Sequence, residues 1–463
     1  MRIRNVDSWR WKGTSMRSLC APVALIFASF LSVSMAHAQD AGLQRARAKA
    51  DTVRAQARSE AAVFSAERQL HAPATNQPMV DDYKITVLSD MVPGRRTLGE
   101  WGFAALIEVR SGGITKRFLF DTGGNPDTVL TNARTLNINI CSVTDVILSH
   151  NHDDHTTGLD TLRSTCRVTN PDAFKNAYGG GDELFWPRIS GGNNVNYMVG
   201  EKARYLALGG NFVLNSQPTP QFLGLAGVWL SGKIARKHDE KTYPGTPNIQ
   251  DPDGKLSPDL IPEELALVIN TRTGMVVVTG CAHAGITNTI ETAQTVLGGA
   301  QPPVTIVGGI HFFPLPIGEE NTSGSEGTVL WEAHQLRLNG VIGILGAHCT
   351  GFERFVFIRD FLGLDDSAAA FSAVGTTLSM AGGFTYTAPF AMNLPLRVKW
   401  QGQLQSAACA TNPPVPSCQV SVSDWNYFVA DKINPNAPPL VIGDGTRMMT
   451  VQQYLAARAG AGL

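Results

Sequence analysis

Short apolar runs separated by polar or glycine-containing turns dominate the chain from Tyr83 onward. Three such runs follow one another and end at an Asp-Thr-Gly turn, which predicts adjacent strands of one sheet. A helical stretch at 128–136 then leads into a further strand that stops at Ser149. The expected strands are 85–88, 103–109, 117–120 and 146–148.

A regular alternation of strands and helices returns in the second half of the chain. Two strands joined by a tight turn come first, and two helix-strand units follow, a pattern typical of α/β folds. The expected elements are strands 265–270 and 274–278, helix 287–297, strand 304–311, helix 327–338 and strand 340–348.

The remaining segments have weaker patterns. Many Gly, Pro and Asn residues between 163 and 259 predict loops and hairpins that wall a pocket. Residues 39–70 are rich in Ala, Arg, Gln and Glu, which indicates a helix outside the main core. The tail predicts a small β-rich module, with strands at 394–400 and 419–422 and a terminal helix at 451–459.

The first 38 residues have the composition of a secretion signal. Basic residues precede an apolar stretch at 20–35, and Ala36-His37-Ala38 places small residues where a signal peptidase reads them. We expect cleavage after Ala38, a periplasmic or secreted mature protein and no stable membrane insertion after cleavage. An uncleaved anchor is the alternative.

Composition and charge bound the classes of function. With 463 residues, 43% of them hydrophobic and 17% charged, the chain can bury a full globular core. The formal net charge of −1 gives no basic excess of the kind that nucleic-acid binding requires. We therefore expect a small-molecule substrate and no nucleic-acid partner, while the oligomeric state stays open.

Six cysteines remain once the leader is removed, which fits an oxidising compartment. Cys409 and Cys418 bracket a Pro-rich loop and predict one disulfide, and Cys141 with Cys166 is a second possible pair. The other two, Cys281 and Cys349, each lie close to a histidine, so metal binding and structural burial both remain open for them.

Metal chemistry is indicated by the segment 149–155, which packs three imidazoles and two carboxylates directly after a strand. His150 and His152 alternate and can converge on one cation, while Asp154 and His155 can turn toward a second. Imidazole and carboxylate ligands suit Zn²⁺, and a catalytic site leaves one position open for water. A solvated loop would account for one such residue but not for five at this spacing.

Three more histidines stand where predicted strands of the second half end: His283, His311 and His348. Because α/β proteins bind ligands at the carboxyl ends of strands, these side chains can converge with the first cluster. For His311, the sequence favours a role at the metal site and a structural role equally. Three histidines in other contexts are expected to be structural: His71, His238 and His334.

The segment from His150 to His155 is similar to the HxHxDH signature of the metallo-β-lactamase superfamily, and Asp121-Thr122-Gly123 looks like its DTG turn. Three further segments, 279–286, 308–312 and 347–351, resemble the branch named for the dihydropterin-methyl-aminobenzene-phosphate synthase of methanopterin biosynthesis. The resemblance covers about residues 82–380.

This resemblance implies an α/β fold, the αββα sandwich, with a two-metal centre at one edge. It also implies that Asp121 stands behind the ligands and orients an imidazole. The superfamily often has a bridging aspartate where this chain has Gly280-Cys281, so Cys281 is expected beside the ligands and its participation stays open. The implied ligands are His150, His152 and His283 for the first metal, and Asp154, His155 and His348 for the second.

The resulting organisation is a leader at 1–38, a helix and linker at 39–81, a hydrolase domain at 82–380 and an extension at 381–463.

We expect two divalent ions, zinc with manganese or iron as alternatives, and an activated water that hydrolyses an ester, lactone or phosphodiester. Asp154 would steer the water and His311 would protonate the leaving oxygen. A di-iron redox protein and a non-catalytic metal-binding protein on the same fold are the alternatives. We discount the pterin phosphate of the branch name, because export would separate the protein from a cytoplasmic biosynthetic step.

Overall fold

The computed structural model describes residues 77–94, 97–240, 248–312, 328–365 and 367–385, together with two short strands near the end of the chain. All of them belong to one of two compact units, Arg58–Leu463. The predicted leader, the helix at 39–70, His71, the Cys409–Cys418 pair and the tail elements at 394–400, 419–422 and 451–459 lie outside the described residues. In the tail, β20 (Val441–Ile442) pairs antiparallel with β21 (Arg447–Met448).

The first sheet has eight strands in the order β19-β18-β1-β2-β3-β4-β5-β8. Its first part is an antiparallel meander, and β3, β4, β5 and β8 run parallel to one another. The hairpin of β18 and β19 extends this sheet past residue 380. The strands are β1 (Asp82–Ser89), β2 (Ala104–Ser111), β3 (Ile114–Phe120), β4 (Asp145–Ile147), β5 (Asn176–Gly179), β8 (Asn211–Leu214), β18 (Thr377–Ser379) and β19 (Gly383–Thr385).

The second sheet has seven strands in the order β17-β16-β15-β14-β13-β10-β9. Strands β14, β15 and β16 are parallel neighbours, so their carboxyl ends lie at the same edge of the sheet. The strands are β9 (Thr219–Pro220), β10 (Val228–Leu230), β13 (Leu267–Thr271), β14 (Gly274–Thr279), β15 (Val304–Gly308), β16 (Val341–Gly346) and β17 (Ala369–Phe371).

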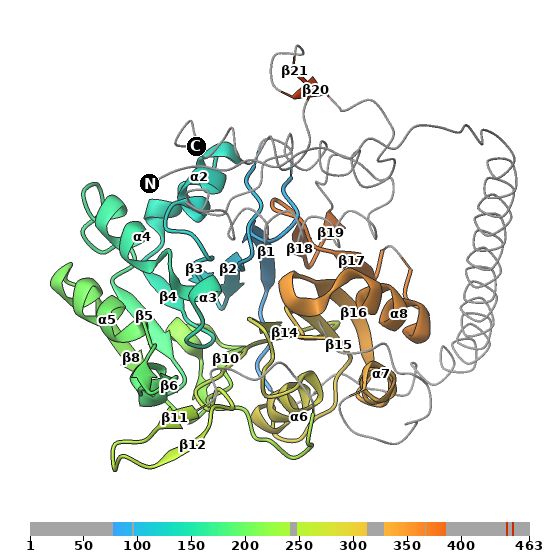
Figure 1. Ribbon diagram of the computed structural model, residues 1–463. Helices are drawn as coiled ribbons and strands as arrows, with labels where there is room; N and C mark the ends of the chain where they lie inside the picture. The colour runs from blue at the N-terminus through green and yellow to red at the C-terminus, as the bar shows by residue number, and fades with distance from the viewer. Residues whose placement is uncertain are drawn as a thin grey trace, which may run out of the picture. The chain divides into compact units, whose positions relative to one another are not determined.

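Helices cover the outer face of each sheet, which makes the fold an αββα sandwich, as the family resemblance implies (Figure 1). The sequence of β2 is almost continuously apolar because both faces of this strand are buried. Ala105 and Ile107 face the core between the sheets, while Leu106 faces the core beneath the helices. A strand buried on both faces cannot alternate with polar residues. The helices are α2 (Thr128–Thr135), α4 (Leu159–Cys166) and α5 (Met198–Ala207) on the first sheet, and α6 (Ile286–Val296), α7 (Val329–Leu338) and α8 (Phe352–Leu362) on the second.

The prediction of loops and hairpins between 163 and 259 is wrong for elements of both sheets, and β9 and β10 of the second sheet are among them. Strands β5 and β8 extend the first sheet, and α5 packs outside it. Each strand is only four residues long. β5 pairs with β4 and β8 pairs with β5, and this pairing makes them strands of the sheet. Hairpins do form in a separate four-stranded sheet of β6 (Arg188–Ser190), β7 (Asn193–Asn194), β11 (Asn248–Gln250) and β12 (Leu256–Pro258).

Short helical turns complete the described chain, and one of them carries a cysteine of a disulfide. Cys141, in η2 (Ile140–Ser142), is bonded to Cys166 at the end of α4, so the second possible pair is formed. Within the described ranges, no helix combines the length and the apolar character that a membrane span needs. The other short elements are α3 (Asp153–Thr156), η3 (Asp182–Phe185), η4 (Phe222–Gly224) and η5 (His348–Thr350).

Candidate metal centre

Strand ends of both sheets deliver the candidate ligands to one place. In the first sheet, β4 ends two residues before Ser149, and His150 follows. In the second sheet, the carboxyl ends of β14, β15 and β16 lie side by side and are followed by His283, His311 and His348. Parallel strands place their carboxyl ends at a common edge, which is where α/β folds bind ligands.

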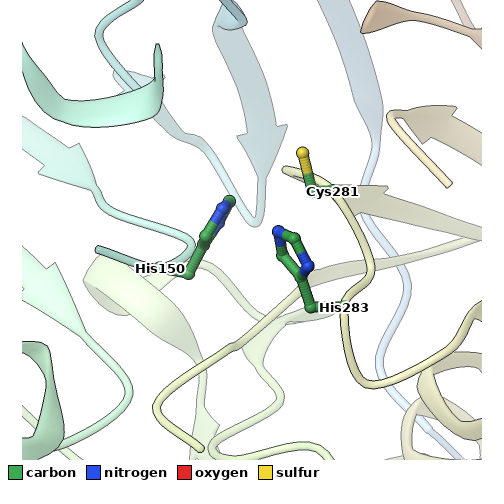
Figure 2. Close-up of side chains that lie close together, drawn as sticks. All are labelled: His150, Cys281 and His283. Atoms are coloured by element: carbon green, nitrogen blue, oxygen red, sulfur yellow. The ribbon is translucent and has the colours of Figure 1, made fainter. Parts of the chain in front are cut away.

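The first set of side chains meets across the two sheets. The ring centroid of His283 lies 4.7 Å from that of His150 and 4.6 Å from that of His152. Figure 2 shows the imidazoles of His150 and His283 reaching the same space from separate loops, with Cys281 beside them. The structure therefore brings together the three histidines assigned to the first metal.

The second set also combines both halves of the molecule. His348 Nε2 lies 2.9 Å from Asp154 Oδ2, and His155 Nε2 lies 3.8 Å from Asp154 Oδ1. His155 and His348 are fully buried, whereas Asp154 is half-buried. His311 completes the cluster, with its ring centroid 4.6 Å from that of His283.

Asp121 supports the cluster from behind. Its Oδ1 accepts a hydrogen bond from the Ser149 backbone N–H at 2.8 Å, and its Oδ2 accepts one from Ser149 Oγ at 2.8 Å. The same Oδ2 lies 2.8 Å from His155 Nδ1. This contact leaves His155 Nε2 to face the cluster, an arrangement typical of carboxylates that orient metal-binding imidazoles.

Two buried carboxylates that the sequence did not single out hold the other ligand loops. Asp90 Oδ1 accepts a hydrogen bond from the backbone N–H of His348 at 3.0 Å. Glu264 Oε1 accepts one from the backbone N–H of His283 at 2.7 Å. Burial is the main cause that raises the pKa of each carboxyl to about 7. Their only sequence signal is position: Asp90 directly follows β1, and Glu264 shortly precedes β13.

A buried arginine stands behind the first histidine loop. Arg188, which is 2% exposed, pairs with Asp259 at 3.1 Å and with Glu263 at 2.7 Å. Glu263 Oε1 in turn accepts a hydrogen bond from the backbone N–H of Asn151 at 3.2 Å. This relay joins the four-stranded sheet to the loop between His150 and His152.

Three of the histidines proposed to bind metal, His150, His152 and His348, are kept neutral by their surroundings. Burial, followed by the neighbouring imidazoles, lowers the pKa of His150 well below its ordinary value. Burial is also the main cause that lowers the pKa of His152 to about 4 and that of His348 below its usual range. A neutral imidazole keeps the lone pair that a cation requires.

Asp154 and His155 form the charged part of the site. Burial works to raise the pKa of Asp154, but His155 and His348 outweigh it and lower that pKa. Burial likewise works to lower the pKa of His155, but Asp154 and Asp121 outweigh it and raise that pKa. The carboxylate of Asp154 is therefore held in its ionised form.

The donor set fits divalent metal ions. Among the described residues, His150 Nε2 and His348 Nδ1 are buried and have no hydrogen-bond partner, which is rare unless a ligand completes the site. Nitrogen, carboxylate oxygen and thiol sulfur together suit zinc and its neighbours in the periodic table. Three groups have ligand atoms within 4.8 Å of one another: His150, Cys281 and His283; His155, Cys281 and His348; and Cys281, His311 and Cys349.

The two other described histidines make contacts of a different kind. His238 Nε2 lies 2.8 Å from Glu291 Oε1, and the ring of His238 packs on Trp331. The ring of His334 packs against Phe361. Neither histidine is in any of the three donor groups.

Comparison with known proteins adds family information to this geometry. Residues 102–171 match the model of the metallo-β-lactamase superfamily. The chain is 30% identical over 294 residues to the 7,8-dihydropterin-6-methyl-4-(β-D-ribofuranosyl)-aminobenzene-5'-phosphate synthase of Methanocaldococcus jannaschii, covering 61% of this chain and 92% of the synthase. It is also 26% identical over 212 residues to an uncharacterized protein of the same organism, covering 45% of this chain and 72% of that protein. A solved structure described as a metal-dependent hydrolase of the β-lactamase superfamily matches at 26% identity and a TM-score of 0.47, covering 64% of this chain and 98% of that chain.

The role of Asp121 gives a testable prediction. Asp121→Asn keeps the shape of the side chain but removes the charge that faces His155, so metal affinity should fall about 10–100-fold. Competition with a chromophoric chelator measures this affinity. Asp172→Asn is the matched control, because Asp172 is an exposed aspartate that pairs only with Lys175 among its described contacts. Equal affinities in both variants would contradict the positioning role of Asp121.

Proposed function

The chain belongs to the metallo-β-lactamase superfamily, and from this membership we propose that it is a metal-dependent hydrolase acting on a small-molecule ester, lactone or phosphodiester. One observation carries the proposal: His283 and His348, from the second sheet, meet His150 and Asp154, from the first sheet, in a buried cluster of metal-binding groups. A purely structural cluster has no need of so many neutral imidazoles in contact.

Two divalent ions would occupy the site, zinc with manganese or iron as the alternatives. When bound, such ions acidify a water molecule and polarise the oxygen of the bond to be cleaved. The residues proposed to hold them are His150, His152 and His283 for one ion, and Asp154, His155 and His348 for the other.

The protein's own groups supply positioning and proton transfer. Asp154 is ionised and half-buried, so a carboxylate oxygen not used for binding can accept a hydrogen bond from the attacking water and orient it. His311, next to His283, is suited to donate a proton to the leaving oxygen. These two residues are the proposed catalytic groups.

A second candidate function follows from the relative of known name. The match covers 92% of a synthase that makes a dihydropterin-aminobenzene-phosphate conjugate, so the same reaction is a specific alternative for this chain. Hydrolysis is favoured because the cluster provides groups that orient water, and because the proposed export would remove the protein from a cytoplasmic pathway.

A panel of reporter substrates tests the proposed function. Purified mature protein should hydrolyse one of the ester, lactone or phosphodiester reporters, lose that activity when its metal is removed by a chelator, and regain it with added zinc, manganese or iron. Elemental analysis of the same sample should find two metal ions per chain. Turnover of the synthase substrates alone would favour the second candidate, a visible iron spectrum without hydrolysis would favour a redox protein, and a metal-free inactive protein would refute both enzymes.

His311 provides a sharper test of the mechanism. His311→Ala should reduce turnover about 10²–10⁴-fold, the usual contribution of a positioned proton donor, while metal content stays the same. His334→Ala is the matched control and should change neither quantity, because His334 is an exposed helical histidine that packs on Phe361. Unchanged turnover in His311→Ala would end the proposed role, and lost metal would assign His311 to binding instead.

Export is part of the same proposal. It is supported by the basic and apolar pattern of the first 38 residues and by the Cys141–Cys166 disulfide, since disulfides persist in oxidising compartments. Sequencing the N-terminus of the protein recovered from the producing cell should give Gln39 as the first residue. A chain that retains its leader in the cytoplasm would refute export.

A further inference from the structure

The geometry points to Cys281 as a metal ligand shared by the two halves of the site, with its sulfur between the His150–His283 pair and the His155–His348 pair. The Cys281 sulfur is within 4.8 Å of donor atoms in both pairs, and it lies 3.1 Å from His155 Nε2. This inference rests on the proposed metal-dependent function and adds a residue that the sequence left open.

The position of Cys281 is built into the fold. Cys281 is 1% exposed and follows β14 by two residues. A Cβ atom on Gly280 would collide with the side chain of Ser149, so glycine is needed for the end of β14 to approach the first histidine loop this closely. The left-handed backbone of Ala282, with a φ of 53°, then turns the chain toward His283.

An independent feature points to a ligand at the same place. His150 is fully buried, its Nδ1 contacts Ser149 Oγ at 2.8 Å, and its Nε2 has no hydrogen-bond partner among the described residues. One donor atom of His150 is thus already used, and His150 is in the same donor group as Cys281. A cation between them would satisfy the remaining nitrogen.

Simple burial of an apolar thiol does not account for this cysteine. None of the three apolar cores formed by the described residues includes Cys281. Its polar neighbours are instead His155 Nε2 and the thiol of Cys349, which lies 3.2 Å from the Cys281 sulfur and donates toward it.

A thiolate in this place would change which metals the site prefers. Cys281 and Asp154 would each contribute one negative charge to a site of otherwise neutral imidazoles. Sulfur is a soft ligand, so the set would favour Zn²⁺ and Fe²⁺ over Mn²⁺ and Mg²⁺, which prefer oxygen. Binding would release the thiol proton to solvent.

Cobalt substitution tests the inference, with Cys349 as the matched control. Metal-free protein, kept reduced and anaerobic, is titrated with Co²⁺ alone, because thiolate bound to Co²⁺ gives a charge-transfer absorption in the near ultraviolet. The wild type and Cys349→Ala should show this band, and Cys281→Ala should lose it. The two cysteines are both buried and adjacent, so general damage to the site would affect both variants.

The other outcomes are distinguishable. A band that survives in Cys281→Ala overturns the inference, as does a wild type that binds two Co²⁺ ions without a band. A band that weakens equally in both variants, while both still bind Co²⁺, would place the metal in the Cys281–His311–Cys349 group and overturn the shared position. A wild type that binds no Co²⁺ overturns the metal-dependent function as well as this inference.

A second measurement keeps the test valid if Cys281→Ala does not fold. X-ray absorption at the zinc edge of the wild-type protein distinguishes a sulfur neighbour at about 2.3 Å from nitrogen at about 2.0–2.1 Å. The expected result is one sulfur neighbour for each zinc ion, because both ions would share the Cys281 sulfur. Zinc surrounded only by nitrogen and oxygen would refute the role of Cys281.

Discussion

The arrangement of the candidate metal centre depends on one buried carboxylate, Asp121. A carboxylate without contact with water is costly unless hydrogen-bond donors satisfy its oxygens. Asp121 meets this need with two groups of Ser149 and with the imidazole of His155. Those partners lie on the loop after β4 and on α3, so the end of β3 fixes the loop and the helix that carry the ligands of the first sheet. Displacing either would leave a buried charge without its partners.

The second sheet reaches this place through close backbone packing. Gly280 lets the end of β14 lie against Ser149, and the parallel register of β14, β15 and β16 aligns the residues that follow them. Asp90 and Glu264 then hold the backbones of His348 and His283. Because the donors come from both sheets, the site is complete only when the sandwich is assembled.

The parts of this protein that follow from local pattern were predictable from the sequence. Both faces of the central strands are buried, which makes them stand out as apolar runs, and the histidines from 150 to 155 are neighbours in the chain. Asp90 could not be found in this way, because it contacts His348 across 258 positions and nothing near it marks the contact. Strands β5 and β8 were missed because each has only four residues, too few to show a strand pattern, and their pairing in the sheet is what identifies them. The contact of Cys281 with Cys349 needs the spatial register of three strands, which a linear pattern does not contain.

The strands β6, β7, β11 and β12 form a sheet of their own beside the two sheets of the sandwich. Its described polar connection to the ligand loop is the relay from Arg188 through Glu263 to the backbone of Asn151. Loops of this sheet can therefore lengthen, shorten or change composition over evolutionary time while the metal ligands keep their positions. The four-stranded sheet could then change specificity while the sandwich keeps the catalytic chemistry. Arg188 lies where these two parts of the chain meet.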